Sequence, residues 1–169
     1  MTEKVKTFLG IVVFGLAFGF VEAAVVIYLR ELIKYNILVF NITQGEVLLN
    51  LRFIAFLSPS QPELQDSKFL AVEMFREFST LLMLGAVAYL SAEKLIKKMA
   101  AFLIVFSVWD LSYYLYLKLV IGWPENWWSP DVFFLLPVPW VGPIITPIVI
   151  SSLLLAIGSY IFLKKQNEA

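Results

Sequence analysis

The chain of 169 residues contains no cysteine and no histidine. Without cysteine it can form no disulfide, thiolate nucleophile, iron–sulfur ligation or cysteine-based zinc site. Without histidine it lacks the usual haem and copper ligand and the usual general base at neutral pH. Any chemistry must therefore use Asp, Glu, Lys, Tyr, Ser or backbone groups, and we expect no cofactor and no metal ion.

A net charge is also missing, because thirteen basic residues balance thirteen acidic ones. The overall charge gives no reason to expect nucleic acid or a polybasic lipid-binding surface. The sequence contains no Gly-rich phosphate loop, HExxH, GxSxG or paired-cysteine motif, and no repeat typical of an inverted-repeat transporter. It therefore assigns no catalytic residue and leaves open whether the protein is an enzyme.

Apolar residues are in excess, since 60% of the chain is hydrophobic and only 15% is charged, with a mean hydropathy of +0.84. They form blocks too long for the core helices of a soluble protein. We predict an all-α integral membrane protein, with a single transmembrane domain over residues 1–169 and a bundle of about four transmembrane helices. The spans are expected at about 7–29, 69–90, 100–121 and 143–163.

The first apolar block has a second interpretation, as a signal peptide. Lys4 and Lys6 precede it, and Val21-Glu22-Ala23 loosely resembles a cleavage site. The apolar run is too long for a signal peptide and continues to Leu29, which favours a membrane span.

Lysines set the predicted orientation, because those near the ends of the four spans all fall on one side. They are Lys4, Lys6, Lys94, Lys97, Lys98, Lys164 and Lys165. We therefore predict a multi-pass protein of the cell membrane with both termini cytoplasmic. Residues 30–68 and 122–142 would then be external.

Both external segments are unusually apolar. Ile37–Thr43 and Val47–Leu57 are too short to span a membrane, and a hairpin or an interfacial helix fits both lengths.

The second external segment is interrupted by prolines over residues 129–143, before the last helix. This pattern predicts a re-entrant or interfacial segment, with a rigid external loop as the alternative. Asp131 could cap a helix beginning at Val132. Four tryptophans suit an interfacial belt, namely Trp123, Trp127, Trp128 and Trp140.

Charged side chains inside the apolar blocks are the candidates for function, because a charge within a bilayer is costly and normally faces the bundle interior. Asp110 is the strongest candidate, near the middle of its span. Ser107, Tyr114 and Lys118 share its helical face, and this face forms a polar track towards the external side. The alternative role for Asp110 is a hydrogen bond between helices that fixes their packing.

The first two spans carry further carboxylates. Gly15 and Gly19 lie on one stripe with Glu22, so another helix should approach there and Glu22 should point at protein. In the second span, spacings of three and four place Glu73, Arg76 and Glu77 on one face, where Arg76 can pair with Glu73.

Together these residues predict an acidic, outward-facing intramembrane pocket that binds or transports a cation, a proton, or a small polar or amphipathic solute. The predicted binding residues are Glu22, Glu73, Arg76, Glu77, Asp110, Tyr114 and Lys118. Periodicity does not encode helix order, so it leaves open whether their faces meet.

Two alternatives come from other classes of protein. One is an intramembrane enzyme that acts on a lipid or isoprenoid at the outer leaflet. In it Glu77 and Asp110 would act as acid and base, or together hold a hard divalent cation through oxygen ligands. The other is a structural or assembly subunit whose charges pair with those of another chain. The expected partners are the lipid bilayer and either further copies of the chain or another membrane protein, but no nucleic acid.

Overall fold

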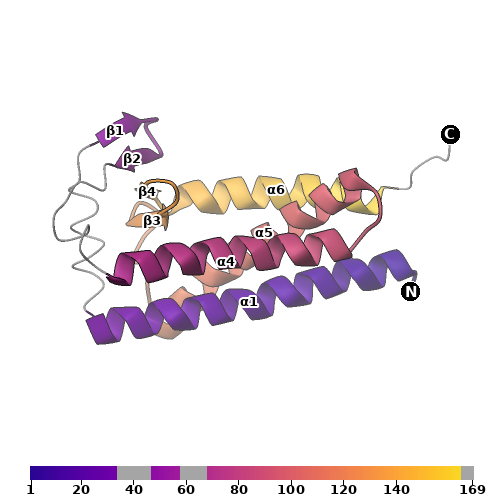
Figure 1. Ribbon diagram of the computed structural model, residues 1–169, viewed down its shortest axis with the longest axis horizontal. Helices are drawn as coiled ribbons and strands as arrows, with labels where there is room; N and C mark the ends of the chain where they lie inside the picture. Colours follow the sequence, from indigo (N-terminus) through magenta and orange to yellow (C-terminus); the bar gives the residue numbers. More distant parts are fainter. Residues whose placement is uncertain (34–46, 58–67, 165–169) are drawn as a thin grey trace. The chain divides into compact units, whose positions relative to one another are not determined.

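A computed structural model of the protein describes residues 1–33, 47–57 and 68–164. It is mostly helical, as Figure 1 shows, with helices α1 (Glu3–Ile33), α4 (Lys68–Leu90), α5 (Leu95–Ile121) and α6 (Ile145–Leu163). The described part also contains four short strands, so the prediction of an all-α protein is wrong for these segments. They are β1 (Val47–Asn50), β2 (Ala55–Leu57), β3 (Pro130–Phe134) and β4 (Trp140–Pro143).

Three of the helices are long and apolar enough to cross a membrane: Glu3–Arg30, Leu95–Ile121 and Ile145–Leu163. These correspond to the first, third and fourth predicted spans. Among the described residues α4 is not in this group, because it carries Glu73, Arg76 and Glu77 in its first half. The helices thus support a membrane protein at three of the four predicted positions.

The helix ends differ from the predicted spans by a few residues. Helix α1 starts before the apolar block, and its first turn is supported by Thr7 Oγ1, which donates to Glu3 O over 3.0 Å. Helix α5 begins at Leu95, directly after a short turn that follows Leu90. Pro147 lies in the first turn of α6, where its missing N–H has no helical partner to lose.

The strands form one antiparallel sheet in the order β1-β2-β4-β3. A hairpin therefore forms within Val47–Leu57, while Ile37–Thr43 lies outside the described residues. The proline-broken segment forms the β3–β4 hairpin, and Asp131 is part of β3 instead of capping a helix at Val132. Leu57, Leu135 and Val141 make a buried apolar cluster on this sheet.

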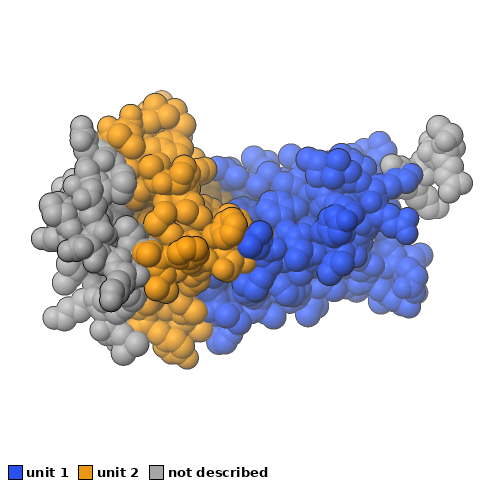
Figure 2. Space-filling view, in the orientation of Figure 1, with its two compact units in different colours: residues 1–23, 82–116, 148–169 blue, residues 24–81, 117–147 orange. Residues whose placement is uncertain are grey.

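The chain divides into two compact units, coloured separately in Figure 2. Unit 1 comprises residues 1–23, 82–116 and 148–169, and unit 2 comprises residues 24–81 and 117–147. Unit 2 contains the sheet. Unit 1 consists of helical segments in its described part.

Small residues allow close helix packing in unit 1. A Cβ at Gly15 would lie 2.9 Å from Val108, and one at Gly19 would lie 2.8 Å from Trp109 O. The predicted approach of another helix to the Gly15–Gly19 stripe is therefore confirmed, and the helix is α5. On α6, a Cβ at Gly158 would lie 2.9 Å from Ala100 O, so α5 packs against α6 as well.

Candidate functional site

Asp110 joins two helices of unit 1. The Ser151 hydroxyl on α6 donates a hydrogen bond of 2.6 Å to Asp110 Oδ2 on α5. Ser151 is 1% exposed and Asp110 is half-buried. By helical rise Asp110 lies about 16 Å from the α5 end at Ile121, and Ser151 lies about 9 Å inside α6. The pair is therefore well inside both candidate spans.

The charge of Asp110 has no opposite charge beside it in the described part of the chain. Neither a lysine nor an arginine there forms an ion pair with its carboxylate, and Ser151 is its one hydrogen-bond partner among these residues. A neutral hydroxyl therefore provides the only direct polar contact that the described chain gives this group.

The other residues of the polar track predicted on α5 have different surroundings. Ser107 is fully buried, but its hydroxyl donates to Leu103 O of its own helix over 2.6 Å. Tyr114 is buried at 5% exposure, with its ring centroid 4.9 Å from that of Tyr113. Lys118 Nζ donates to Gly122 O over 3.0 Å and to Pro124 O over 2.7 Å. Lys118 therefore provides hydrogen-bond donors to backbone carbonyls just past the α5 C-terminus.

Glu22 is buried in unit 1, at 8% exposure. It lies three residues after Gly19, on the stripe where α1 meets α5. Ser112 Oγ lies in the same contact and donates to Trp109 O over 3.0 Å. Trp109 is 7% exposed, and its Nε1 has no hydrogen-bond partner within the described ranges. This helix contact therefore encloses polar groups as well as small residues.

In unit 2 the carboxylates of α4 serve two different partners. Arg76 Nη2 and Nε donate to Glu73 Oε2 over 2.8 and 3.0 Å, which is the ion pair expected from the spacing. Glu73 is 4% exposed. Glu77 Oε2 instead accepts the Leu135 N–H over 2.9 Å. Glu77 thus attaches α4 to the backbone just after β3.

Some partners were not found from the sequence. Ser151 lies in an apolar block, and the only sign in the sequence of a polar contact there is the Ser151-Ser152 pair itself.

The predicted belt tryptophans differ in their surroundings. Arg30 Cζ lies 3.9 Å from the ring centroid of Trp123, so this tryptophan makes a cation–π contact in unit 2. Trp127 and Trp128 are 61% and 68% exposed, as residues of an interfacial belt would be.

The predicted site residues fall into two groups. Glu22, Asp110 and Tyr114 belong to unit 1, whereas unit 2 holds Glu73, Arg76, Glu77 and Lys118. A single pocket containing all seven therefore stays a prediction. Among the described residues, no three acidic side chains come together as a metal site would require.

No protein-family model, curated protein or solved structure matches this chain. In the part of the chain that the structure describes, fold and composition define a mostly helical protein with three helices able to cross a membrane and with buried polar groups. Its function has to be argued from those residues.

Proposed function

We propose that the protein is a multi-pass protein of the cell membrane whose four helices all cross the bilayer, with both termini cytoplasmic. The lysines support this orientation. Lys4, Lys94 and Lys164 line one pocket of unit 1 together, as expected if the helix ends that carry them face the same side of the membrane. As a fourth span, α4 would carry its charges as an internal Glu73–Arg76 pair and a carboxylate bonded to the chain.

Within this protein, we propose that Asp110 binds a cation or a proton, which the protein holds or transports. The supporting observation is the Asp110–Ser151 contact well inside two spans, without an ion pair in the described chain. An aspartate charge at the centre of a membrane helix costs about 2.5–3.5 kcal/mol on insertion scales. A hydrogen bond between membrane helices contributes about 0.6 kcal/mol on average.

The cost of the Asp110 charge exceeds the contribution of one hydrogen bond, and this favours some candidate ligands over others. The Ser151 hydroxyl alone does not offset the cost of a charge at Asp110, whereas a bound proton or small cation removes or balances that charge. A neutral polar or amphipathic solute would leave the charge in place. The proposal is therefore narrower than the prediction from the sequence, which also allowed such solutes.

The test compares the purified full-length protein with Asp110→Asn, which keeps the shape and an acceptor for Ser151. In proteoliposomes, flux of H⁺, Na⁺ and K⁺ is followed with ion-sensitive dyes. In detergent, melting temperatures are recorded across pH and alkali cations. A ligand at a hundred times its dissociation constant stabilises by about 2.7 kcal/mol, which a melting curve resolves.

We expect the wild type to show a cation- or pH-dependent melting temperature and Asp110→Asn to lose that dependence while keeping its helical circular dichroism. Ser152→Ala is the control, because Ser152 is exposed and its hydroxyl donates to Ile148 O of its own helix. The proposal is overturned if Asp110→Asn responds to every cation and to pH as the wild type does.

A further inference from the structure

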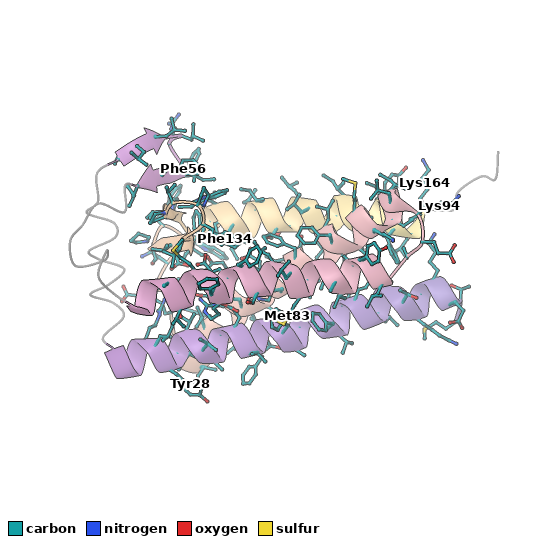
Figure 3. The ribbon with its side chains drawn as sticks, viewed as in Figure 1. Tyr28, Phe56, Met83, Lys94, Phe134 and Lys164 are labelled. Carbon is teal, nitrogen blue, oxygen red and sulfur yellow. The ribbon has the colours of Figure 1, made fainter. Side chains whose placement is uncertain are left out.

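One end of unit 1 carries a pocket of about 330 Å³ with an unusual concentration of positive charge. Its lining includes one acidic residue, Glu93, and four lysines. The lysines are Lys4, Lys94, Lys97 and Lys164. They come from the start of α1, the α4–α5 turn, the start of α5 and the end of α6. Lys94 and Lys164 are labelled at this end in Figure 3. We call this the lysine pocket.

Two of these lysines are held in place by the end of α6. Lys97 Nζ donates to Ile161 O over 2.5 Å and to Phe162 O over 3.0 Å. Lys4 Nζ donates to Leu163 O over 2.7 Å and to Lys164 O over 2.8 Å. These ammonium groups satisfy carbonyls that a helix end leaves open. Their positions are therefore fixed before any ligand arrives, which lowers the entropy cost of binding.

The other two lysines keep donors available. Lys94 Nζ makes no hydrogen bond or ion pair to any described residue, and Lys164 Nζ lies 5.5 Å from the ring centroid of Tyr160. Four ammonium groups around one pocket repel one another, and Glu93 compensates only one of them. An anion with several acceptor oxygens, such as a phosphate, would offset the rest and use the available donors.

An apolar groove of about 280 Å³ adjoins the same turn and shares Glu93 with the lysine pocket. The last turns of α4 and the first turns of α5 form it. Gly85 leaves it open, since a Cβ there would meet nothing within 4 Å. Lys98 Nζ lies 3.4 Å over the ring centroid of Tyr89 at its charged end. Phe102 extends the groove along the apolar part of α5.

We propose that this end of unit 1 binds an anionic phospholipid, with the headgroup phosphate in the lysine pocket and one acyl chain in the groove. A free phosphate would need the lysines but not the groove. In the proposed orientation this end faces the cytoplasmic leaflet, where anionic lipids bind basic pockets between helices. The balanced charge of the whole chain conceals this local excess. The inference rests on the proposed orientation but does not involve Asp110.

The experiment measures the melting temperature of the detergent-purified full chain with phosphatidylglycerol, with phosphatidylcholine of the same acyl chains, and with inorganic phosphate. The headgroup variant is Lys94→Gln/Lys164→Gln, because neither side chain holds the end of α6. Its control is Lys6→Gln, an exposed lysine paired with Glu3 outside the pocket. The groove variant is Gly85→Leu, with Gly10→Leu as its control, since Gly10 is equally unobstructed.

We expect phosphatidylglycerol to stabilise the wild type well beyond phosphatidylcholine. The double lysine variant should bind it at least about tenfold more weakly, since it loses two of the basic groups that attract the anionic headgroup. Gly85→Leu should also weaken binding, and both controls should match the wild type. Equal stabilisation by the two lipids overturns the proposal. So does stabilisation by inorganic phosphate that Gly85→Leu leaves unchanged, which would identify a free-anion site.

The experiments distinguish a failure of the lipid proposal from a failure of the cation or proton proposal at Asp110. Asp110→Asn leaves the lysine pocket intact, and the double lysine variant leaves the Asp110–Ser151 contact intact. A wild type that shows no preference for phosphatidylglycerol but responds to cations as expected would overturn only the lipid proposal.

Discussion

The Ser151 hydroxyl on α6 donates a hydrogen bond of 2.6 Å to Asp110 Oδ2 on α5. This bond connects two helices that can each cross a membrane. The same two helices also pack closely further along their length, where Gly158 brings the α6 backbone against Ala100 O. The contact is the hydrogen bond between helices considered as one role for Asp110. Ligand binding there is the proposed second role, and the contribution of the hydrogen bond to stability can be measured separately.

Ser151→Ala should destabilise the protein, because it removes the donor from a carboxylate inside the bundle. Leaving such a group unsatisfied costs about 1–3 kcal/mol. Ser152→Ala should change stability by less than about 0.5 kcal/mol, since Ser152 is exposed and bonded within α6. Thermal unfolding in one detergent compares the two. Equal melting temperatures would show that the Ser151 hydroxyl does not hold Asp110.

Gly19→Ala should destabilise the α1–α5 contact. The new Cβ would lie 2.8 Å from Trp109 O, a backbone atom that moves only with the helix. Overpacking of this kind costs about 1–3 kcal/mol. Gly10→Ala, on the same helix with nothing within 4 Å, should be neutral or stabilise by up to about 1 kcal/mol. A melting temperature for Gly19→Ala at or above that of Gly10→Ala would contradict the packing.

The helices could be predicted because their information is local. Apolar blocks of sufficient length define α1, α5 and α6, and the Gly15–Gly19 stripe indicates a helix contact without identifying the partner helix. Glu73 and Arg76 lie one turn apart, so their ion pair followed from the spacing alone. Each of these features depends on residues that are neighbours in sequence or on one helical face.

The joining of two hairpins into one sheet and the Asp110 partner could not be predicted, because both depend on residues far apart in sequence. Ala55 pairs with Val141 across the β2–β4 contact, and neither segment shows a regular alternation of apolar and polar residues. Pro137 and Pro139 also argue against a central strand, and they fall between β3 and β4. Ser151 meets Asp110 only through the register of two helices, which hydropathy does not encode.

Glu77→Ala should loosen the segment that follows β3. Its carboxylate accepts the Leu135 N–H over 2.9 Å, and Leu135 is buried in the cluster with Leu57 and Val141. Hydrogen exchange of the Leu135 amide should therefore become faster by at least about tenfold, which corresponds to losing about 1.4 kcal/mol from a charge-assisted bond.

Glu77→Gln should show a smaller increase, because its amide oxygen still accepts the bond without the charge. Glu125→Ala is the control, since Glu125 is exposed in the same unit. Hydrogen–deuterium exchange with mass spectrometry over residues 130–143 provides the measurement. If Glu77→Ala and Glu125→Ala exchange alike, the bond to Leu135 does not restrain this segment.

Arg76→Met should be the most destabilising of these changes. It would leave Glu73, at 4% exposure, as a buried charge without the guanidinium that donates to it over 2.8 and 3.0 Å. Breaking a buried pair from one side costs about 3–5 kcal/mol, whereas replacing both partners is often close to neutral. The double variant Glu73→Gln/Arg76→Met should therefore recover most of the lost stability.

The Glu3–Lys6 pair is the matched control for this cycle. It has the same spacing and a distance of 2.6 Å, but its side chains are 86% and 53% exposed. Lys6→Met should cost no more than about 1 kcal/mol, because water screens an exposed pair. Thermal unfolding of all variants in one detergent compares the two pairs. If Arg76→Met costs no more than Lys6→Met, or if the double variant recovers nothing, burial does not determine what the Glu73–Arg76 pair contributes to stability.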